Sequence, residues 1–277
     1  MARTKRRVTA AIEVFVCIDV PDLDRGVAFY TTAGLGLVLA RRIGDDLAEL
    51  AGASVPIHLV TQPPGTPPSA RVAQARDYDR HWTPVHLDVV TADLERAVTA
   101  ATTAGAVLER GIARRSWNAL AGLADPFGHG FDLLEEPGSP RAGAVDVALD
   151  VPDVGEAVRF YTRALGLVLR DEPMPGLWAR LAGAPCTIHL QHAPERTYTR
   201  HWTPVHVDFL THDLEPAVQR AVAAGATLDR PIQSAAWGRM ANLADPFGHG
   251  FCLVALGPRG YDALTEQADA RKEGDTP

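Results

Sequence analysis

The chain has few cysteines and no long apolar run. Three cysteines occur in 277 residues, and the odd number and scattered positions of Cys17, Cys186 and Cys252 give no sign of a disulfide framework. No apolar stretch approaches the roughly 18 residues that a membrane-spanning helix needs, and the start lacks the apolar block of a signal peptide. We therefore expect a cytoplasmic protein with no membrane partner.

The chain also lacks an excess of positive charge. Its net charge is −7, which gives no general affinity for nucleic acid, and the basic run at 3–7 is typical of a solvated tail. A glycine-rich phosphate loop and a nucleophile elbow are both missing, which excludes nucleotide and acyl-enzyme chemistry of those kinds. With 46% hydrophobic and 22% charged residues, the composition is that of a globular protein of one large or two ordinary domains.

Repeated motifs divide the sequence into two halves. The heptapeptide "RHWTPVH" occurs at 80–86 and at 200–206, and "LADPFGHGF" occurs at 123–131 and at 243–251. Shorter repeats upstream extend the match, so the chain is predicted to contain two domains and a polar tail. The predicted boundaries are 11–138, 141–257 and 258–277.

Each half divides again into two similar units. Alternating apolar residues in 85–90 predict a strand with one face in the core, and Leu94, Ala97, Val98 and Ala101 then follow helical spacing. A strand, a helix and about three further strands are predicted four times, starting near residues 13, 84, 144 and 204. The predicted fold is α+β, with four βαβββ units.

These motifs resemble the vicinal oxygen chelate superfamily, which includes glyoxalase I, bleomycin-resistance proteins, fosfomycin-resistance enzymes and extradiol dioxygenases. The resemblance rests on a strand followed by "DLERAV" or "DLDRGVAFY", on Gly-Leu-Gly, and on the final "DPFGHGF" hairpin. Phe127, Phe247, His129 and His249 depart from the usual form of that hairpin. The resemblance implies that units pair into two tandem half-open barrels, each around a cleft that holds a divalent metal in the enzymes.

The resemblance also implies which positions bind metal. They lie seven residues before the Asp that opens each helix and on the last strand of each unit. The six metal-binding candidates are His58, His86, Asp132, Asp146, His189 and His206. Phe15 and Cys252 occupy the other two positions. The donor types suit Fe, Mn, Zn or Ni, whereas the alternative interpretation is that these polar side chains line a pocket without metal.

The pairing of the units remains open in the sequence. Pairing within each half gives one set of His58, His86 and Asp132 and another of Asp146, His189 and His206; we expect this arrangement because its connections are short. Pairing the second unit with the third instead collects His86, Asp132, Asp146 and His189, and leaves Phe15, His58, His206 and Cys252 as a degenerate site.

Further candidates lie near these positions. Asp88 and Asp208 each lie two residues after a candidate histidine. They are catalytic candidates, either as general bases or as groups that orient the imidazole. The alternative is that they are hydrogen-bonded acids at a strand end. The substrate-binding candidates are His81, Trp82, Trp117, His201, Trp202 and Trp237. The alternative interpretation is that these side chains only cover the core.

Two functions of different classes follow. The first is a metal-dependent lyase, isomerase, cyclase or oxygenase that acts on a small oxygen-rich molecule, with natural-product tailoring as one setting. The second is a metal-free protein that sequesters a drug or metabolite. A third reading has one half active and the other supporting it. The expected partner in each case is a small molecule, and the protein is expected to be a monomer or a homodimer.

Overall fold

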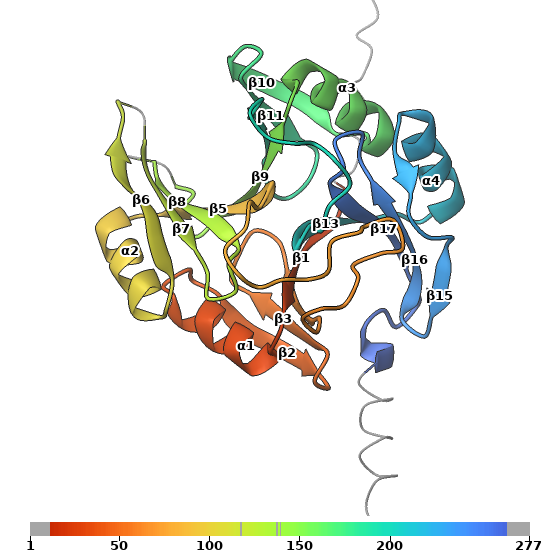
Figure 1. Cartoon of the computed structure of the whole chain (residues 1–277), viewed down its shortest axis with the longest axis horizontal. Helices are drawn as coiled ribbons and strands as arrows, with labels where there is room; N and C mark the ends of the chain where they lie inside the picture. The colour runs from red at the N-terminus through yellow and green to blue at the C-terminus, as the bar shows by residue number, and fades with distance from the viewer. Residues whose placement is uncertain (1–11, 117, 137, 139, 265–277) are drawn as a thin grey trace, which may run out of the picture.

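The computed structural model describes residues 12–264 with the exception of 117, 137 and 139. Four units follow one another along the chain, and their helices lie on the outside of two curved sheets (Figure 1). The predicted α+β fold of four units in two half-barrels is confirmed.

The units share the order strand, helix, strands. The first contains β1 (Val14–Val20), α1 (Leu23–Thr32), β2 (Val38–Ile43), β3 (Leu47–Ala51) and β4 (Ile57–Thr61). The second contains β5 (Val85–Thr91), α2 (Leu94–Thr103), β6 (Val107–Arg114), β7 (Ala119–Ala124) and β8 (Gly130–Glu135). The third contains β9 (Val145–Val151), α3 (Val154–Leu165), β10 (Val168–Met174), β11 (Trp178–Ala182) and β12 (Ile188–His192). The fourth contains β13 (Val205–Leu210), α4 (Leu214–Ala223), β14 (Thr227–Leu228), β15 (Gln233–Ala235), β16 (Gly238–Ala244) and β17 (Gly250–Leu256).

Local sequence explains where the units begin. Val14, Val16 and Ile18 of β1 are buried in the core, which leaves the alternate side chains on the inner face of the sheet. An Asp then ends the turn before each helix. The side chains of Asp22, Asp93 and Asp153 accept a hydrogen bond from the backbone N–H three residues later, as helix N-caps do.

The two sheets each combine one unit from either half of the sequence. Sheet A has the order β14-β16-β17-β13-β1-β4-β3-β2, with β15 beside β16, and joins the first unit to the fourth. Sheet B has the order β10-β11-β12-β9-β5-β8-β7-β6 and joins the second unit to the third. Antiparallel pairs hold the units together, β1 with β13 and β5 with β9 (Figure 1).

The expected pairing within each half is therefore wrong, and the alternative pairing is correct. Connection length explains the outcome. Only residues 136–144 separate β8 from β9, whereas residues 62–84 separate β4 from β5 and residues 193–204 separate β12 from β13. The shortest connection thus joins units of one sheet, and the longer ones cross between sheets. The domain boundaries 11–138 and 141–257 describe the two sequence repeats, and as boundaries of structural domains they stay a prediction.

The two long repeated motifs pack against each other. The backbone N–H of Gly130 donates to Thr83 Oγ1 at 2.9 Å, and Arg80 Nη1 donates to the Gly128 carbonyl oxygen at 3.2 Å. Gly128 has a φ of +83°, and a Cβ there would lie 2.2 Å from the carbonyl oxygen of Asp79. The second copies repeat the contacts, since Gly250 N donates to Thr203 Oγ1 at 2.9 Å. The heptapeptide thus fixes the hairpin that begins the last strand of its unit.

No helix in the described part of the chain is long and apolar enough to cross a membrane.

Candidate functional site

Three carboxylates lie side by side on the inner face of sheet B. Asp88 of β5 is in register with Asp132 of β8 on one side and with Asp146 of β9 on the other. All three are at most 7% exposed. His86 lies two residues before Asp88 and shares its face of β5. This row brings together predicted candidates from the second and third units.

His86, Asp88 and Asp132 form a compact group of donors. One ligand atom from each lies within 4.8 Å of the others, and His86 Nε2 is 3.7 Å from Asp88 Oδ1. That buried Oδ1 has no hydrogen-bond partner among the described residues. Burial, together with the charges of Asp132 and Asp146, raises the pKa of Asp88 well above its usual range. The group therefore holds an unsatisfied oxygen that a cation would stabilise.

Arg110 balances the charge of Asp132. Its Nη2 donates to both carboxylate oxygens of Asp132, at 2.7 and 3.0 Å. A Cβ at Gly122 would lie 2.4 Å from Arg110 Nε, so the glycine is what lets the guanidinium cross β7. The Arg110 side chain is 67% exposed, which leaves it free to move toward solvent.

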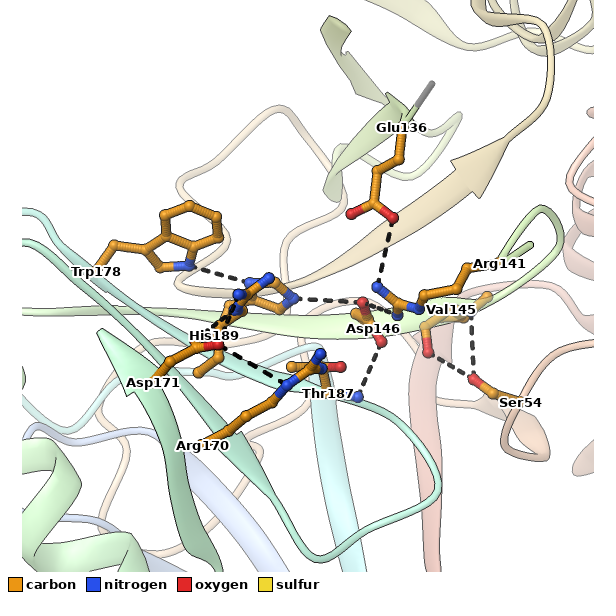
Figure 2. Close-up of polar contacts among 11 residues, drawn as sticks. Ser54, Glu136, Arg141, Val145, Asp146, Arg170, Asp171, Trp178, Thr187 and His189 are labelled. Atoms are coloured by element: carbon orange, nitrogen blue, oxygen red, sulfur yellow. Dashed lines mark hydrogen bonds and ion pairs between the residues drawn. The ribbon is translucent and has the colours of Figure 1, made fainter. Parts of the chain in front are cut away.

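Asp146 is held by a separate set of partners (Figure 2). Arg141 donates to Oδ2 and also lies near Glu136, while the backbone N–H of Thr187 donates to Oδ1 at 2.8 Å. His189 Nε2 lies 3.3 Å from Oδ2. Although burial opposes it, the hydrogen bonds from His189 and Arg141 lower the pKa of Asp146.

His189 is turned away from a metal-binding role. The indole N–H of Trp178 donates to His189 Nδ1 at 3.1 Å, so the ring proton sits on Nε2 and points at Asp146 (Figure 2). A metal ion at Nε2 would need the opposite tautomer. His189 thus lies on the same sheet as His86, as the alternative pairing predicted, and its role as a metal ligand stays a prediction.

Among the described residues, polar pockets lie over sheet B. One, of about 240 Å³, is lined by His86 and Asp132 and by Trp82, Gln191 and Arg196. The other, of about 210 Å³, lies beside Asp146 and Arg141. Two members of the donor group, His86 and Asp132, therefore face a space that a small molecule could enter.

Sheet A carries the remaining predicted positions. His58 is fully buried between Phe15 and Tyr261, with ring centroids 4.6 and 5.2 Å away. His206 and Cys252 lie on β13 and β17 of the same sheet. The predicted set of His58, His86 and Asp132 is wrong, because His58 belongs to the other sheet. The set of Asp146, His189 and His206 is wrong for the same reason.

A further cavity lies over sheet A. Its volume is about 510 Å³, within the usual range of small-molecule sites. Aromatic rings, thiols and carboxylates share its wall. The aromatic and polar lining includes Cys17, His58, Arg76, Trp202, His206, Asp208, Trp237 and Tyr261.

The His-Trp pairs of the two heptapeptides interlock. His81 lies against Trp202 with centroids 5.1 Å apart, and Trp82 lies against His201 at 5.5 Å. The indole N–H of Trp82 donates to Asp150, and that of Trp202 donates to Asp19, both at 2.8 Å. Each tryptophan also lines a cavity, Trp202 over sheet A and Trp82 over sheet B.

The other aromatic candidates have separate positions. Trp237 lines the sheet A cavity beside Tyr261, at a centroid distance of 5.1 Å. Trp117 lies outside the described residues. The assignment of substrate contacts to these side chains stays a prediction.

Sequence reasoning missed several side chains of both sites. Cys17 follows Phe15 by two residues and so shares its face, a signal that strand alternation offers. Arg110 and Arg141 gave no such signal. The partner of Arg110 depends on strand register, and the partner of Arg141 depends on the conformation of the connection between β8 and β9. Tyr261 falls in the segment predicted as a polar tail, yet its side chain is 8% exposed.

Comparison with known proteins identifies the relatives. A sequence model described as the glyoxalase-like domain matches residues 15–134 and again residues 146–254. The anthracycline biosynthesis proteins DnrV of Streptomyces peucetius and DauV of Streptomyces sp. (strain C5) are both 31% identical, over 157 and 150 residues. These alignments cover 52% and 50% of this chain, and the chain spans about half the length of each relative, 54% and 52%.

Two solved structures share the fold over nearly the whole chain. Glyoxalase I from Zea mays superposes with a TM-score of 0.68 at 18% identity, covering 94% of this chain and 96% of its own. A putative dioxygenase from Bacillus subtilis gives 0.58 at 13% identity, covering 98% of both chains. Together with the two matches along the sequence, the four units and their paired sheets show that the chain belongs to the glyoxalase-like domain family.

Proposed function

We propose that the protein is a metal-dependent enzyme whose divalent ion is held on sheet B by His86, Asp88 and Asp132. The observation that carries the proposal is the compact donor group with its unsatisfied buried oxygen on Asp88. One imidazole and two carboxylates suit Mn²⁺, Fe²⁺ or Zn²⁺. Asp88 thus joins the ligands, whereas His189 orients Asp146.

The charges around the group support this assignment. Three adjacent carboxylates in a buried row repel one another, and a bound cation would relieve that repulsion. Arg110 and Arg141 balance two of the carboxylates in the metal-free protein. Asp88 has no arginine among its hydrogen-bond partners, which makes it the carboxylate with most to gain from a metal.

The residues at the mouth favour an oxygen-rich substrate. Arg196 lies over the Trp82 ring at 5.5 Å, and both line the 240 Å³ pocket with Gln191. Arginine and glutamine side chains donate hydrogen bonds to substrate oxygens, and the indole offers an apolar face. A divalent ion, when bound, polarises such oxygens and stabilises a developing negative charge on them.

The similarity to two anthracycline biosynthesis proteins supports a natural-product substrate. We infer an isomerase, lyase, cyclase or oxygenase reaction on a molecule of this kind, in the cytoplasm.

Metal analysis of matched variants tests the proposal. The chain is prepared without a histidine tag, stripped with a chelator, dialysed against Mn²⁺, and measured by elemental analysis. The wild type is expected to retain one Mn²⁺, and His86→Ala to lose it. His206→Ala is the matched control, because the repeat places it at the equivalent position on sheet A, and it should keep the ion. Loss of Mn²⁺ in both variants, or no binding in the wild type, would refute the assignment.

A second candidate function is sequestration of a ligand without metal. It is favoured by the 510 Å³ cavity over sheet A and by Trp237 and Tyr261 in its wall. Under this reading, Trp237→Ala would weaken binding of a flat aromatic probe, and chelation of metal would leave that binding unchanged.

A further inference from the structure

A second donor group, made partly of sulfur, lies in the wall of the sheet A cavity. Cys17 of β1 is in register with His206 of β13, and Asp208 lies two residues further along β13. One ligand atom from each lies within 4.8 Å of the others. All three side chains line the 510 Å³ cavity.

Asp208 links the members of this group. Its Oδ2 accepts a hydrogen bond from the Cys17 thiol at 3.3 Å, and its Oδ1 lies 3.6 Å from His206 Nε2. Oδ1 is buried and has no hydrogen-bond partner among the described residues, and Asp208 as a whole is only 4% exposed. A buried carboxylate oxygen without a partner is costly, so this atom is a place where a cation would be stabilised.

We propose that Cys17, His206 and Asp208 bind Zn²⁺, with the remaining coordination position open to the cavity. A sulfur, a nitrogen and an oxygen donor form the kind of three-ligand set that zinc uses when it keeps one position for water or substrate. The thiolate selects zinc over harder ions such as Mg²⁺ and Mn²⁺. Cys252 lies beside the group on β17, where Asn242 Nδ2 donates to its sulfur at 3.3 Å.

This site is separate from the one on sheet B, and of its three ligands only His206 was among the predicted metal-binding positions. Phe15 fills the predicted ligand position on β1, and Cys17 is two residues further along the same strand. The repeat places Ala148 at the position equivalent to Cys17, so sheet B has no thiol at this place. The inference does not depend on the proposed function of sheet B.

Zinc binding must displace a proton from Cys17. In the metal-free protein, burial and the neighbouring Asp208 raise the pKa of Cys17, so the thiol keeps its proton and donates it to the carboxylate. The ion replaces that proton, which passes to solvent, and the thiolate sulfur then bonds to the metal. The apparent affinity for zinc should therefore increase with pH.

Cobalt provides the direct spectroscopic test. Co²⁺ is titrated into the chelator-stripped full chain under reducing conditions, and the near-ultraviolet thiolate-to-cobalt charge-transfer band is followed. Zn²⁺ is then added to compete. We expect a band whose final intensity corresponds to one thiolate-bound Co²⁺ per chain and which disappears with Zn²⁺. Cys17→Ala, which installs the residue found at the equivalent position in the third unit, should abolish the band and weaken Zn²⁺ binding on the order of a hundredfold or more.

Controls separate this result from damage to the fold and from the sheet B site. Cys186→Ser removes a buried thiol in the connection between β11 and β12 and should leave the band intact. His86→Ala should also leave it intact. The near-ultraviolet circular dichroism of Cys17→Ala reports whether its aromatic packing is native, and Asp208→Asn gives a second test that retains the thiol. The proposal is overturned by a wild type without a thiolate band, or by a band that survives in natively folded Cys17→Ala.

Discussion

At the residue scale, Asp88 and Asp146 are neighbours whose surroundings shift their pKa values in opposite directions. Asp88 lies between two other carboxylates and one of its buried oxygens has no hydrogen-bond partner, whereas Asp146 receives hydrogen bonds from Arg141, Thr187 and His189. Burial and like charges raise the pKa of the first, and hydrogen bonds lower that of the second despite burial.

We predict that Asp88→Asn stabilises the metal-free protein at pH 7. The raised pKa means that the folded state disfavours ionised Asp88, so stability is lost as pH rises above the unfolded value of about 3.9. Asparagine removes that loss. The free energy of unfolding measured in urea should rise by about 1–2 kcal/mol at pH 7, and the difference should shrink as pH falls toward 4.

Asp146→Asn is the matched comparison and should have the opposite sign. Its lowered pKa means that ionised Asp146 stabilises the fold above the unfolded pKa, and that this contribution disappears as pH falls through the folded pKa. Asp146→Asn should therefore be destabilising at pH 7. Equal effects of both substitutions at all pH values would contradict this account of the carboxylate row.

The residue scale also separates what the sequence predicts from what it does not. Strand alternation places His86 and Asp88 on one face, because that depends on neighbouring residues alone. It cannot reveal that Arg110 reaches Asp132, because that contact depends on the register of β6 and β7 and on the absence of a side chain at Gly122. The tautomer of His189 is set by Trp178, eleven residues away on another strand.

At the element scale, helix starts differ in one respect among the four units. Asp153 caps α3 by accepting from Glu156 N at 2.7 Å, whereas Asp213 makes no side-chain hydrogen bond at the start of α4. We predict that Asp153→Ala lowers the free energy of unfolding by about 1 kcal/mol. Asp213→Ala, the matched control, should have a clearly smaller effect in the same urea titration. Equal losses would show that the cap hydrogen bond is not the source of the stability.

Element order was predictable, and element pairing was not. The apolar periodicity and the repeated Asp before each helix indicate a strand, a helix and further strands four times. Which first strands meet depends on the lengths of the connections between strand ends. The repeat makes each half look like a unit of folding, whereas the shortest connection, 136–144, crosses the boundary between halves.

At the scale of the whole molecule, the pairing predicts which fragment folds alone. Residues 79–198 contain every strand of sheet B, whereas residues 11–138 contain half of each sheet and leave β1 and β5 without their antiparallel partners. We predict a cooperative urea transition and native-like circular dichroism for the fragment 79–198, and self-association or no folding for 11–138. A folded monomer of residues 11–138 would contradict the arrangement of the sheets.

The repeated heptapeptide has its role at this scale as well. Each copy lies in the connection that crosses between sheets, and His81 and Trp82 of one copy contact Trp202 and His201 of the other. Trp82 and Trp202 line the cavities over sheets B and A, and the rim role of the four side chains stays a prediction. Whether the molecule is a monomer or a homodimer stays a prediction.

The two sheets have diverged in chemistry while keeping one architecture. Sheet B presents one imidazole and two carboxylates, and sheet A presents a thiol, an imidazole and a carboxylate beside a larger cavity. The repeat equates Asp132 with Cys252 and Ala148 with Cys17, so two substitutions account for the difference between the two donor groups. Under the two proposals, one fold would hold two metal sites with different preferences.

The anomalous difference map of a crystal soaked in Mn²⁺ tests the central claim most directly. The account predicts a strong peak within bonding distance of His86, Asp88 and Asp132 on sheet B, and no peak of comparable height on sheet A. A map with no peak at these three residues, or with its manganese only beside Cys17 and His206, would contradict it.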